Sequence, residues 1–100
     1  MTDYSKMSDA EVNWNVAYHI GLKTVERAES GEFDPCNNPS DAWPIILNNL
    51  ISMVWDCAED SSAEWWNAVA QFDECSIQYQ SNPLRAAMIV YLMMKESENA

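Results

Sequence analysis

The sequence predicts a single α+β domain, with helices towards both ends and short strands between them. Apolar residues recur at helical spacing over about 9–28 and again over about 83–97. Two short intervening segments have the features of strands. The segment at about 50–55 contains β-branched and aromatic residues, and the segment at about 75–79 alternates in polarity. One hundred residues, 48% of them apolar, are enough to build one hydrophobic core.

The first helix has a well-defined start. Ser8 is followed three residues later by Glu11, which is the spacing of a reciprocal capping box at a helix N-terminus. Met7 and Val12 flank this cap at the spacing of a hydrophobic staple. We therefore expect one helix over about 9–28.

A loop rich in Pro and Asn leads into a second, shorter helix over about 40–48. Two starts fit the pattern. In one, Asn38 is the N-cap and Pro39 takes the first helical position. In the other, Ser40 is the N-cap and Pro44 lies within the first turn. The sequence leaves both open.

The segment over about 64–70 fits either a helix or a strand. As a helix, it begins with a capping box of Ser61 and Glu64, and its apolar residues share one face: Trp65, Ala68, Val69 and Phe72. As a strand, it directs Trp65 and Trp66 to opposite faces, one towards the core and one towards the surface. The periodicity favours the helix.

The last helix, over about 83–97, begins with Asn82 as N-cap and Pro83 at its first position. Nine consecutive apolar residues, 86–94, cover nearly its whole circumference, which indicates a helix buried on several sides at the centre of the domain. Arg85 lies in the first turn, where the helix dipole disfavours a positive charge. We therefore expect it to pair with one of the carboxylates from the middle of the chain.

The chain is strongly acidic, and its charge is unevenly distributed. Sixteen acidic residues face five basic ones, for a formal net charge of -11, and no Lys or Arg occurs between Ala28 and Leu84. That stretch carries ten carboxylates: Glu29, Glu32, Asp34, Asp41, Asp56, Glu59, Asp60, Glu64, Asp73 and Glu74. Such a surface repels nucleic acid and anionic membranes and attracts basic protein surfaces.

Three segments carry a family resemblance: FDPCNNPSDAWPII at 33–46, the pair Trp66 and Ala68, and NPLRAAMIVYLMMKES at 82–97. In this order they resemble the small NinX-like proteins of unknown function from lambdoid phages and prophages. The chain departs from the family pattern before its Pro-Ile-Ile motif, where Ala42-Trp43 replaces a Gly-rich approach. The resemblance brings no catalytic residue with it.

The resemblance implies more about fold and origin than about activity. It implies that 64–70 is a strand, so that 50–55, 64–70 and 75–79 form a small antiparallel sheet packed on the buried C-terminal helix. It also implies a phage or prophage gene whose product acts in the cytoplasm of a bacterial host.

The acidic, tryptophan-bearing middle of the chain is the candidate binding surface. We expect the protein to bind a host or defence protein that has a basic surface, and to inhibit or modulate it. One version of this hypothesis is that the basic surface is the partner's nucleic-acid-binding site. The candidate partner-binding residues are Asp56, Glu59, Asp60, Glu64, Trp65, Asp73 and Glu74. The alternative is a homodimeric interaction module without nucleic-acid mimicry.

Other functional classes find little support in the sequence. There is one histidine, His19, and the three cysteines have no closely spaced pair, so we expect no metal, no cofactor and no enzymatic activity. Chemistry between Cys36 and His19 is the one catalytic alternative. We expect no direct binding to nucleic acid. The longest apolar run has nine residues and no secretion signal opens the chain, so we also expect no membrane association.

Overall fold

The computed structural model describes residues 2–98, with the backbone alone at Asp73. Its elements, in chain order, are η1 (Tyr4–Lys6), α1 (Asp9–Ile20), α2 (Leu22–Ser30), α3 (Pro39–Asn48), β1 (Ser52–Cys57), β2 (Glu64–Val69), η2 (Gln71–Asp73), β3 (Ser76–Gln80) and α4 (Pro83–Glu98). The α+β class and its small antiparallel sheet are confirmed.

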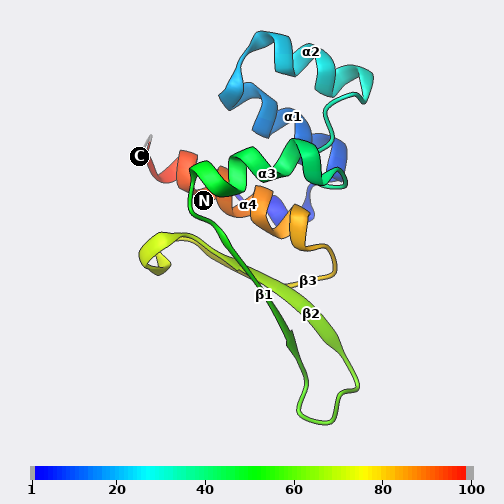
Figure 1. Ribbon diagram of the computed structural model, residues 1–100, viewed down its shortest axis with the longest axis vertical. Coiled ribbons are helices and arrows are strands. Elements are labelled where there is room, and N and C mark those ends of the chain that lie inside the picture. Colours follow the sequence, from blue (N-terminus) through cyan, green and yellow to red (C-terminus); the bar gives the residue numbers. More distant parts are fainter. Residues whose placement is uncertain (1, 99–100) are drawn as a thin grey trace.

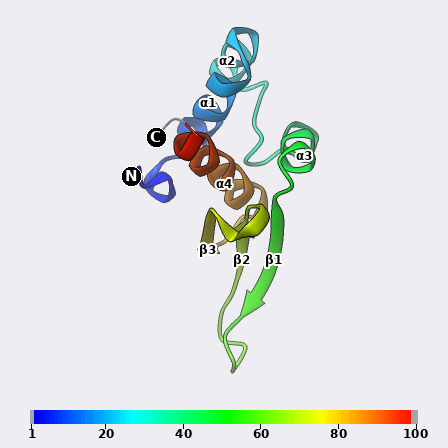
Figure 2. The same ribbon diagram turned by 90° about the vertical axis from the view of Figure 1, so that its left-hand side faces the viewer.

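The sheet has the strand order β1-β2-β3, and both neighbouring pairs are antiparallel. Figures 1 and 2 show the helices on one side of the sheet, with α4 between the sheet and the α1–α2 pair and with α3 beside it above β1. Residues Ala86 to Leu92 of α4 are all buried, so the C-terminal helix is the centre of the core as predicted. Within residues 2–98, no helix lies on the opposite face of the sheet.

The predicted helix over 9–28 is divided into α1 and α2 at Gly21. Gly21 has φ 153° and ψ 168°, a conformation that side-chain-bearing residues rarely adopt. Its amide donates to the carbonyl of Ala17 at 2.9 Å, and its carbonyl accepts from the amide of Val25 at 3.1 Å. The glycine therefore ends one helix and begins the next, and the prediction of one continuous helix was wrong here.

Local capping signals account for the other helix starts. The Ser8 hydroxyl accepts from the amide of Glu11 at 3.1 Å, which confirms the first capping box together with the reciprocal bond. Asn38 caps α3 by accepting from the amide of Ser40 at 3.0 Å, so the first of the two alternative starts is correct. Asn82 caps α4 by accepting from the amide of Leu84 at 2.9 Å.

Residues 64–69 form the central strand β2, which confirms the strand that the family resemblance implied and not the helix that the periodicity favoured. Both edges of β2 are hydrogen-bonded, to β1 and to β3, and Ala68 is 1% exposed. A helix in this position would leave the two outer strands without a partner. Pairing on both sides therefore overrides the local periodicity.

Candidate functional site

The β1–β2 hairpin extends away from the helices and forms one end of the molecule (Figure 1). Its two strands pair from Ser52 opposite Val69 to Cys57 opposite Glu64. The connecting loop closes through a bond from the amide of Ala58 to the carbonyl of Ala63 at 2.9 Å. The acidic loop of the sequence therefore lies at the far end of a projecting hairpin.

Four of the predicted site residues gather at this end, and we call them the acidic tip: Asp56, Glu59, Asp60 and Glu64, all exposed. Bonds from Ser62 lower the pKa of Asp60 below its usual range. Every ion pair formed within residues 2–98 uses carboxylates other than these. The acidic tip therefore presents its charge to solvent without a basic partner within residues 2–98.

The remaining two acidic candidates lie elsewhere. Glu74 is exposed in the connection between β2 and β3, at the end of β2 opposite the acidic tip. The length of β2, at about 3.3 Å per residue, separates the two ends by roughly 17 Å. Asp73 lies in the same connection, and its side chain is outside the described residues. The structure thus brings Asp56, Glu59, Asp60 and Glu64 together and places the other pair apart.

Aromatic side chains line both faces of the hairpin next to the acidic tip. Trp65 and Trp66 are each partly buried, so neither is the fully buried core residue that alternation led us to expect. Trp66 lies on the same face as buried Ala68, opposite Trp55, which is 51% exposed. The hairpin runs beyond the helical layer at this point, so its tryptophans are covered only in part. Trp55 is a surface aromatic residue that the sequence reasoning missed, although the strand pattern of 50–55 contained it.

On the outer face, Trp65 packs against Tyr79 with their ring centroids 5.0 Å apart. An irregularity in the β2–β3 pairing produces this contact, because Trp66 opposes Gln80 while Ala68 opposes Ile77. The extra residue on β3 is accommodated with Tyr79 at φ 61°, and its amide donates to the Asn67 side chain at 3.3 Å. Tyr79, 69% exposed, extends the aromatic surface around Trp65.

A second apolar surface lies where β1 leaves the body of the protein. A cavity of about 420 Å³, which we call the α3–β1 groove, is lined mainly by Trp43, Ile46, Leu47, Leu50, Ile51 and Met53. Trp43, Leu47 and Leu50 are each more than half exposed. Apolar side chains therefore border β1 at the end opposite the acidic tip.

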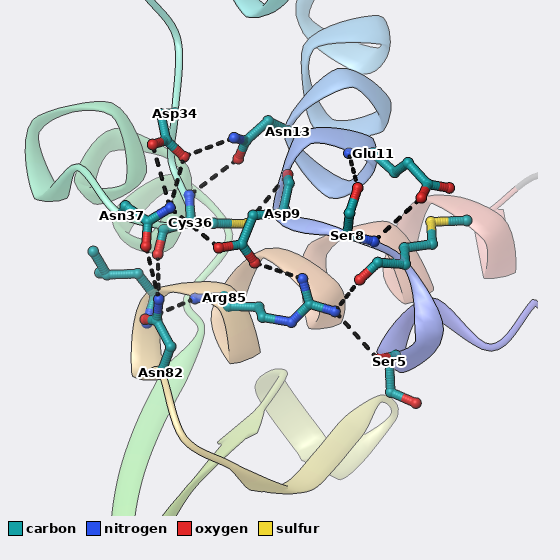
Figure 3. A network of polar contacts seen from close by, with 12 residues as sticks. Ser5, Ser8, Asp9, Glu11, Asn13, Asp34, Cys36, Asn37, Asn82 and Arg85 are labelled. Carbon is teal, nitrogen blue, oxygen red and sulfur yellow. Dashed lines mark hydrogen bonds and ion pairs between the residues drawn. The ribbon is translucent and has the colours of Figure 1, made fainter. Parts of the chain in front are cut away.

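Arg85 lies at the centre of a polar network in which α4 meets the N-terminal segment (Figure 3). Its Nη1 donates to Asp9 Oδ1 at 2.7 Å, and its Nη2 donates to the carbonyl of Ser5 at 3.2 Å and to that of Met7. The Arg85 side chain is only 14% exposed. The expected partner from the middle of the chain was wrong, because the first turn of α4 packs against the start of α1.

The same network holds the loop before α3. The Asn13 side chain donates to Asp34 at 2.6 Å and accepts from the amide of Cys36 at 3.1 Å. The Asn82 side chain donates to the carbonyl of Cys36 at 2.6 Å. Within the described chain, no buried side-chain nitrogen or oxygen lacks a partner. Two of the segments that carry the family resemblance, 33–46 and 82–97, thus meet in this polar contact.

Cys36 and His19 are not brought together. Cys36 contacts α1 at Asn13, and His19 lies six residues further along, about 9 Å along the helix axis. Burial, with a contribution from Asp9, raises the pKa of the Cys36 thiol to about 12. Burial also lowers the pKa of His19, whose ring packs edge-on against Tyr91. In the part of the chain that the structure describes, no group of three or more His, Cys, Asp or Glu residues is arranged to hold a metal ion.

Thiol reactivity should follow these environments. Only the thiolate reacts readily, and the Cys36 pKa of about 12 keeps its thiol protonated. At about pH 8, iodoacetamide should modify the partly exposed Cys57 and leave Cys36 unmodified, as read by peptide mass spectrometry. In urea all the cysteines should react, which controls for intrinsic reactivity. Rapid alkylation of Cys36 in the folded protein would contradict its placement.

Comparison with known proteins supplies the family. No helix within residues 2–98 is long and apolar enough to cross a membrane. No curated protein and no solved structure matches the chain significantly. A sequence model of the family described as "Bacteriophage P22, NinX" matches residues 3–95, a span that includes the hairpin, the α3–β1 groove and the Arg85 network. On this match over nearly its whole length, the chain belongs to the bacteriophage P22 NinX family.

Proposed function

We propose that this protein is a phage accessory protein that binds a basic surface of a host or defence protein through its hairpin and thereby inhibits or modulates that protein. The observation that carries the proposal is the acidic tip, whose carboxylates project together and have no basic partner in the ion pairs of residues 2–98. The proposed activity is binding without catalysis, in the cytoplasm of the bacterial host.

Electrostatics favours this choice of partner. Complementary charge accelerates encounter and disfavours partners of like charge, so the acidic tip selects basic surfaces and rejects nucleic acid. Basic protein surfaces commonly hold nucleic acid through its phosphates. A hairpin bound there would occupy the nucleic-acid site with carboxylates. Trp55 and Trp65, beside the acidic tip, supply the aromatic anchors that often dominate interface energies.

Neutralising the acidic tip should weaken partner binding about tenfold or more, mainly through slower association. The variant is Asp56→Asn, Glu59→Gln, Asp60→Asn and Glu64→Gln. A matched control removes four charges from exposed residues outside the candidate site: Glu26→Gln, Glu29→Gln, Glu32→Gln and Glu98→Gln. The measurement is affinity capture from the bacterial host, followed by surface plasmon resonance on the protein captured.

The comparison between the two variants decides the result. Loss of capture by the tip variant alone supports the hairpin as the binding site, whereas equal loss by both variants indicates a response to net charge. Binding through the acidic tip should also weaken as salt is raised, because exposed charges are screened within about 8 Å at physiological ionic strength. Binding that is insensitive to salt would count against a charge-based mechanism.

A homodimer is the second candidate. The observation that favours it is a cluster of exposed apolar residues around the α1–α2 junction: Trp14, Tyr18, Ile20 and Leu22. Trp14 and Tyr18 stack with their ring centroids 5.8 Å apart. Apolar clusters of this kind often mark protein interfaces. Light scattering on a size-exclusion column separates a monomer of 11.4 kDa from a dimer of twice that mass.

A further inference from the structure

We propose that the free edge of β1 takes up an extended, basic segment of the partner protein as a fourth, antiparallel strand, with an apolar side chain of that segment seated in the α3–β1 groove. This inference rests on the proposed function and specifies how the hairpin holds its partner. It is carried by the backbone groups along β1, the groove at one end of the strand and the acidic tip at the other.

The backbone groups that face outward from β1 follow from the hairpin pairing. The amide of Ala58 bonds to the carbonyl of Ala63 across the hairpin, so the residues of β1 that bond to β2 are those at even positions. The amides and carbonyls of Met53, Trp55 and Cys57 then point to the open edge. The amide of Cys57 indeed bonds to the side chain of Asp56, at 2.8 Å, and not to β2.

Only the middle of this edge is open. Ile51, the preceding outward-facing position, donates its amide to the carbonyl of Ile46 at 3.1 Å. Cys57, the following one, is covered by Asp56. In the contacts of residues 2–98, Met53 and Trp55 are left with outward amides and carbonyls that bond to no other element. Natural proteins usually cover or charge such an edge, so a regular, apolar stretch left open is a template for strand addition.

The other edge of the sheet is less suited to this role. β3 is interrupted by the irregular pairing at Tyr79, which bends a strand and disrupts regular pairing. Residues of the N-terminal segment, among them Thr2 and Tyr4, line one cavity together with Ser76 and Gln78 of β3. β1 is thus the edge that combines a regular strand with an open flank.

The α3–β1 groove provides specificity beside this edge. Met53 and Ser52 belong both to β1 and to the groove lining, so a strand placed against β1 passes directly along it. Figure 2 shows α3 on the helical side of β1, where alternate side chains of an added strand would point. In strand addition the main chain supplies affinity, and pockets for alternate side chains supply selectivity. The exposed Trp43 and Leu47 favour a large apolar side chain at this position.

For an antiparallel strand, the charge distribution sets the order of basic and apolar residues along the added segment. β1 runs from the groove, at Ser52, to the acidic tip, at Cys57. An antiparallel strand runs the opposite way, so its first residues lie at the acidic tip and its last residues lie at the groove. No Lys or Arg between Ala28 and Leu84 competes for the tip. The matching segment therefore begins with Lys or Arg, continues with β-branched residues and ends with a large apolar residue.

A synthetic peptide tests this directly: acetyl-Lys-Arg-Lys-Val-Thr-Val-Thr-Leu-Phe-amide, added to the whole protein. Titration should show binding by nuclear magnetic resonance, with slower amide exchange at Met53 and Trp55. Trp55→Pro removes one outward amide and Trp55→Thr keeps it, while both lose the indole; proline is tolerated at an open strand edge. The proline variant should bind the peptide about tenfold more weakly than the threonine variant, because the loss of one hydrogen bond of ordinary strength changes the dissociation constant by about that factor.

Three outcomes overturn the inference: no binding, equal binding by the proline and threonine variants, and binding without protection of Met53 and Trp55. If the proline variant fails to fold, the same peptide N-methylated at its central residues replaces it and should lose binding to the unaltered protein. A peptide with Ser in place of Lys and Arg separates the two proposals. Equal binding of that peptide along β1 would leave strand addition standing but would overturn the basic character of the segment and, with it, the charge-based function. Charge-dependent binding without protection along β1 would overturn strand addition and leave the charge-based function standing.

Discussion

Replacing Arg85 with methionine is expected to lower the free energy of unfolding by about 2–4 kcal/mol. The Arg85 side chain is 14% exposed, and its guanidinium donates to the Asp9 carboxylate and to the carbonyls of Ser5 and Met7. Methionine fills similar space but donates no hydrogen bond, so the two carbonyls lose this donor and the Asp9 carboxylate keeps only its bond from Asn37. Because Asp9 is 42% exposed and can be partly rehydrated, the loss stays below that of a fully buried pair. Urea denaturation followed by circular dichroism measures it.

Arg27→Met is the matched control for this prediction. Arg27 lies 3.9 Å from Asp41 and its side chain is 50% exposed, so its pair should contribute less than about 1 kcal/mol. If the two methionine variants unfold at the same urea concentration, the Arg85 network does not stabilise the fold as its contacts indicate. Arg85→Lys should recover only part of the loss, because an ammonium cannot reproduce the planar fork of the guanidinium.

Met88→Ala is expected to lower the free energy of unfolding by about 2–5 kcal/mol. Met88 is 0% exposed and lies in α4, which packs against all three strands and against α1 and α3. Truncation leaves a cavity that the surrounding elements can close only in part, so dispersion contacts are lost as well as burial. Thermal and urea unfolding should both show the change.

Leu22→Ala is the control for the core variant. The Leu22 side chain is 83% exposed, so its truncation should change the free energy of unfolding by no more than about 0.5 kcal/mol. An equal loss from Leu22→Ala and Met88→Ala would show that α4 is not the centre of the core. The comparison also tests whether the exposed α1–α2 surface contributes to stability in the monomer.

The scaffold and the proposed binding surface overlap only at the α3–β1 groove, where Trp43 and Ile46 of the 33–46 segment line the cavity. Two of the three segments that carry the family resemblance, 33–46 and 82–97, contribute Asp34, Cys36 and Arg85 to the polar network and α4 to the core; the third, Trp66 and Ala68, lies in β2. The acidic tip and the open edge of β1 lie between these segments in sequence and project from the network in space. The family resemblance therefore rests largely on the scaffold, whereas the proposed binding surface lies mainly on the hairpin.

Local sequence was sufficient for the helix starts and for the buried helix. The bonds at Ser8, Asn38 and Asn82 join residues at most three apart, so side-chain chemistry and spacing were enough to predict them. The apolar run at 86–94 likewise predicted burial. Its apolar residues surround the helix, so the helix must pack against other elements on several sides to bury them. The acidity of the loop after β1 could also be read directly from the sequence.

Contacts between distant residues settled the features that local patterns left open or misjudged. Residues 64–69 are a strand because β1 and β3 bond to both of their edges, although their own periodicity favours a helix. Arg85 pairs with Asp9, 76 residues away, because α4 packs on the start of α1. The hairpin carries Asp56 and Glu64 together beyond the helical layer and separates them from Glu74. Such features depend on which surfaces the whole chain buries together. They cannot be predicted from the spacing of residues along the sequence, because they arise from contacts between distant residues.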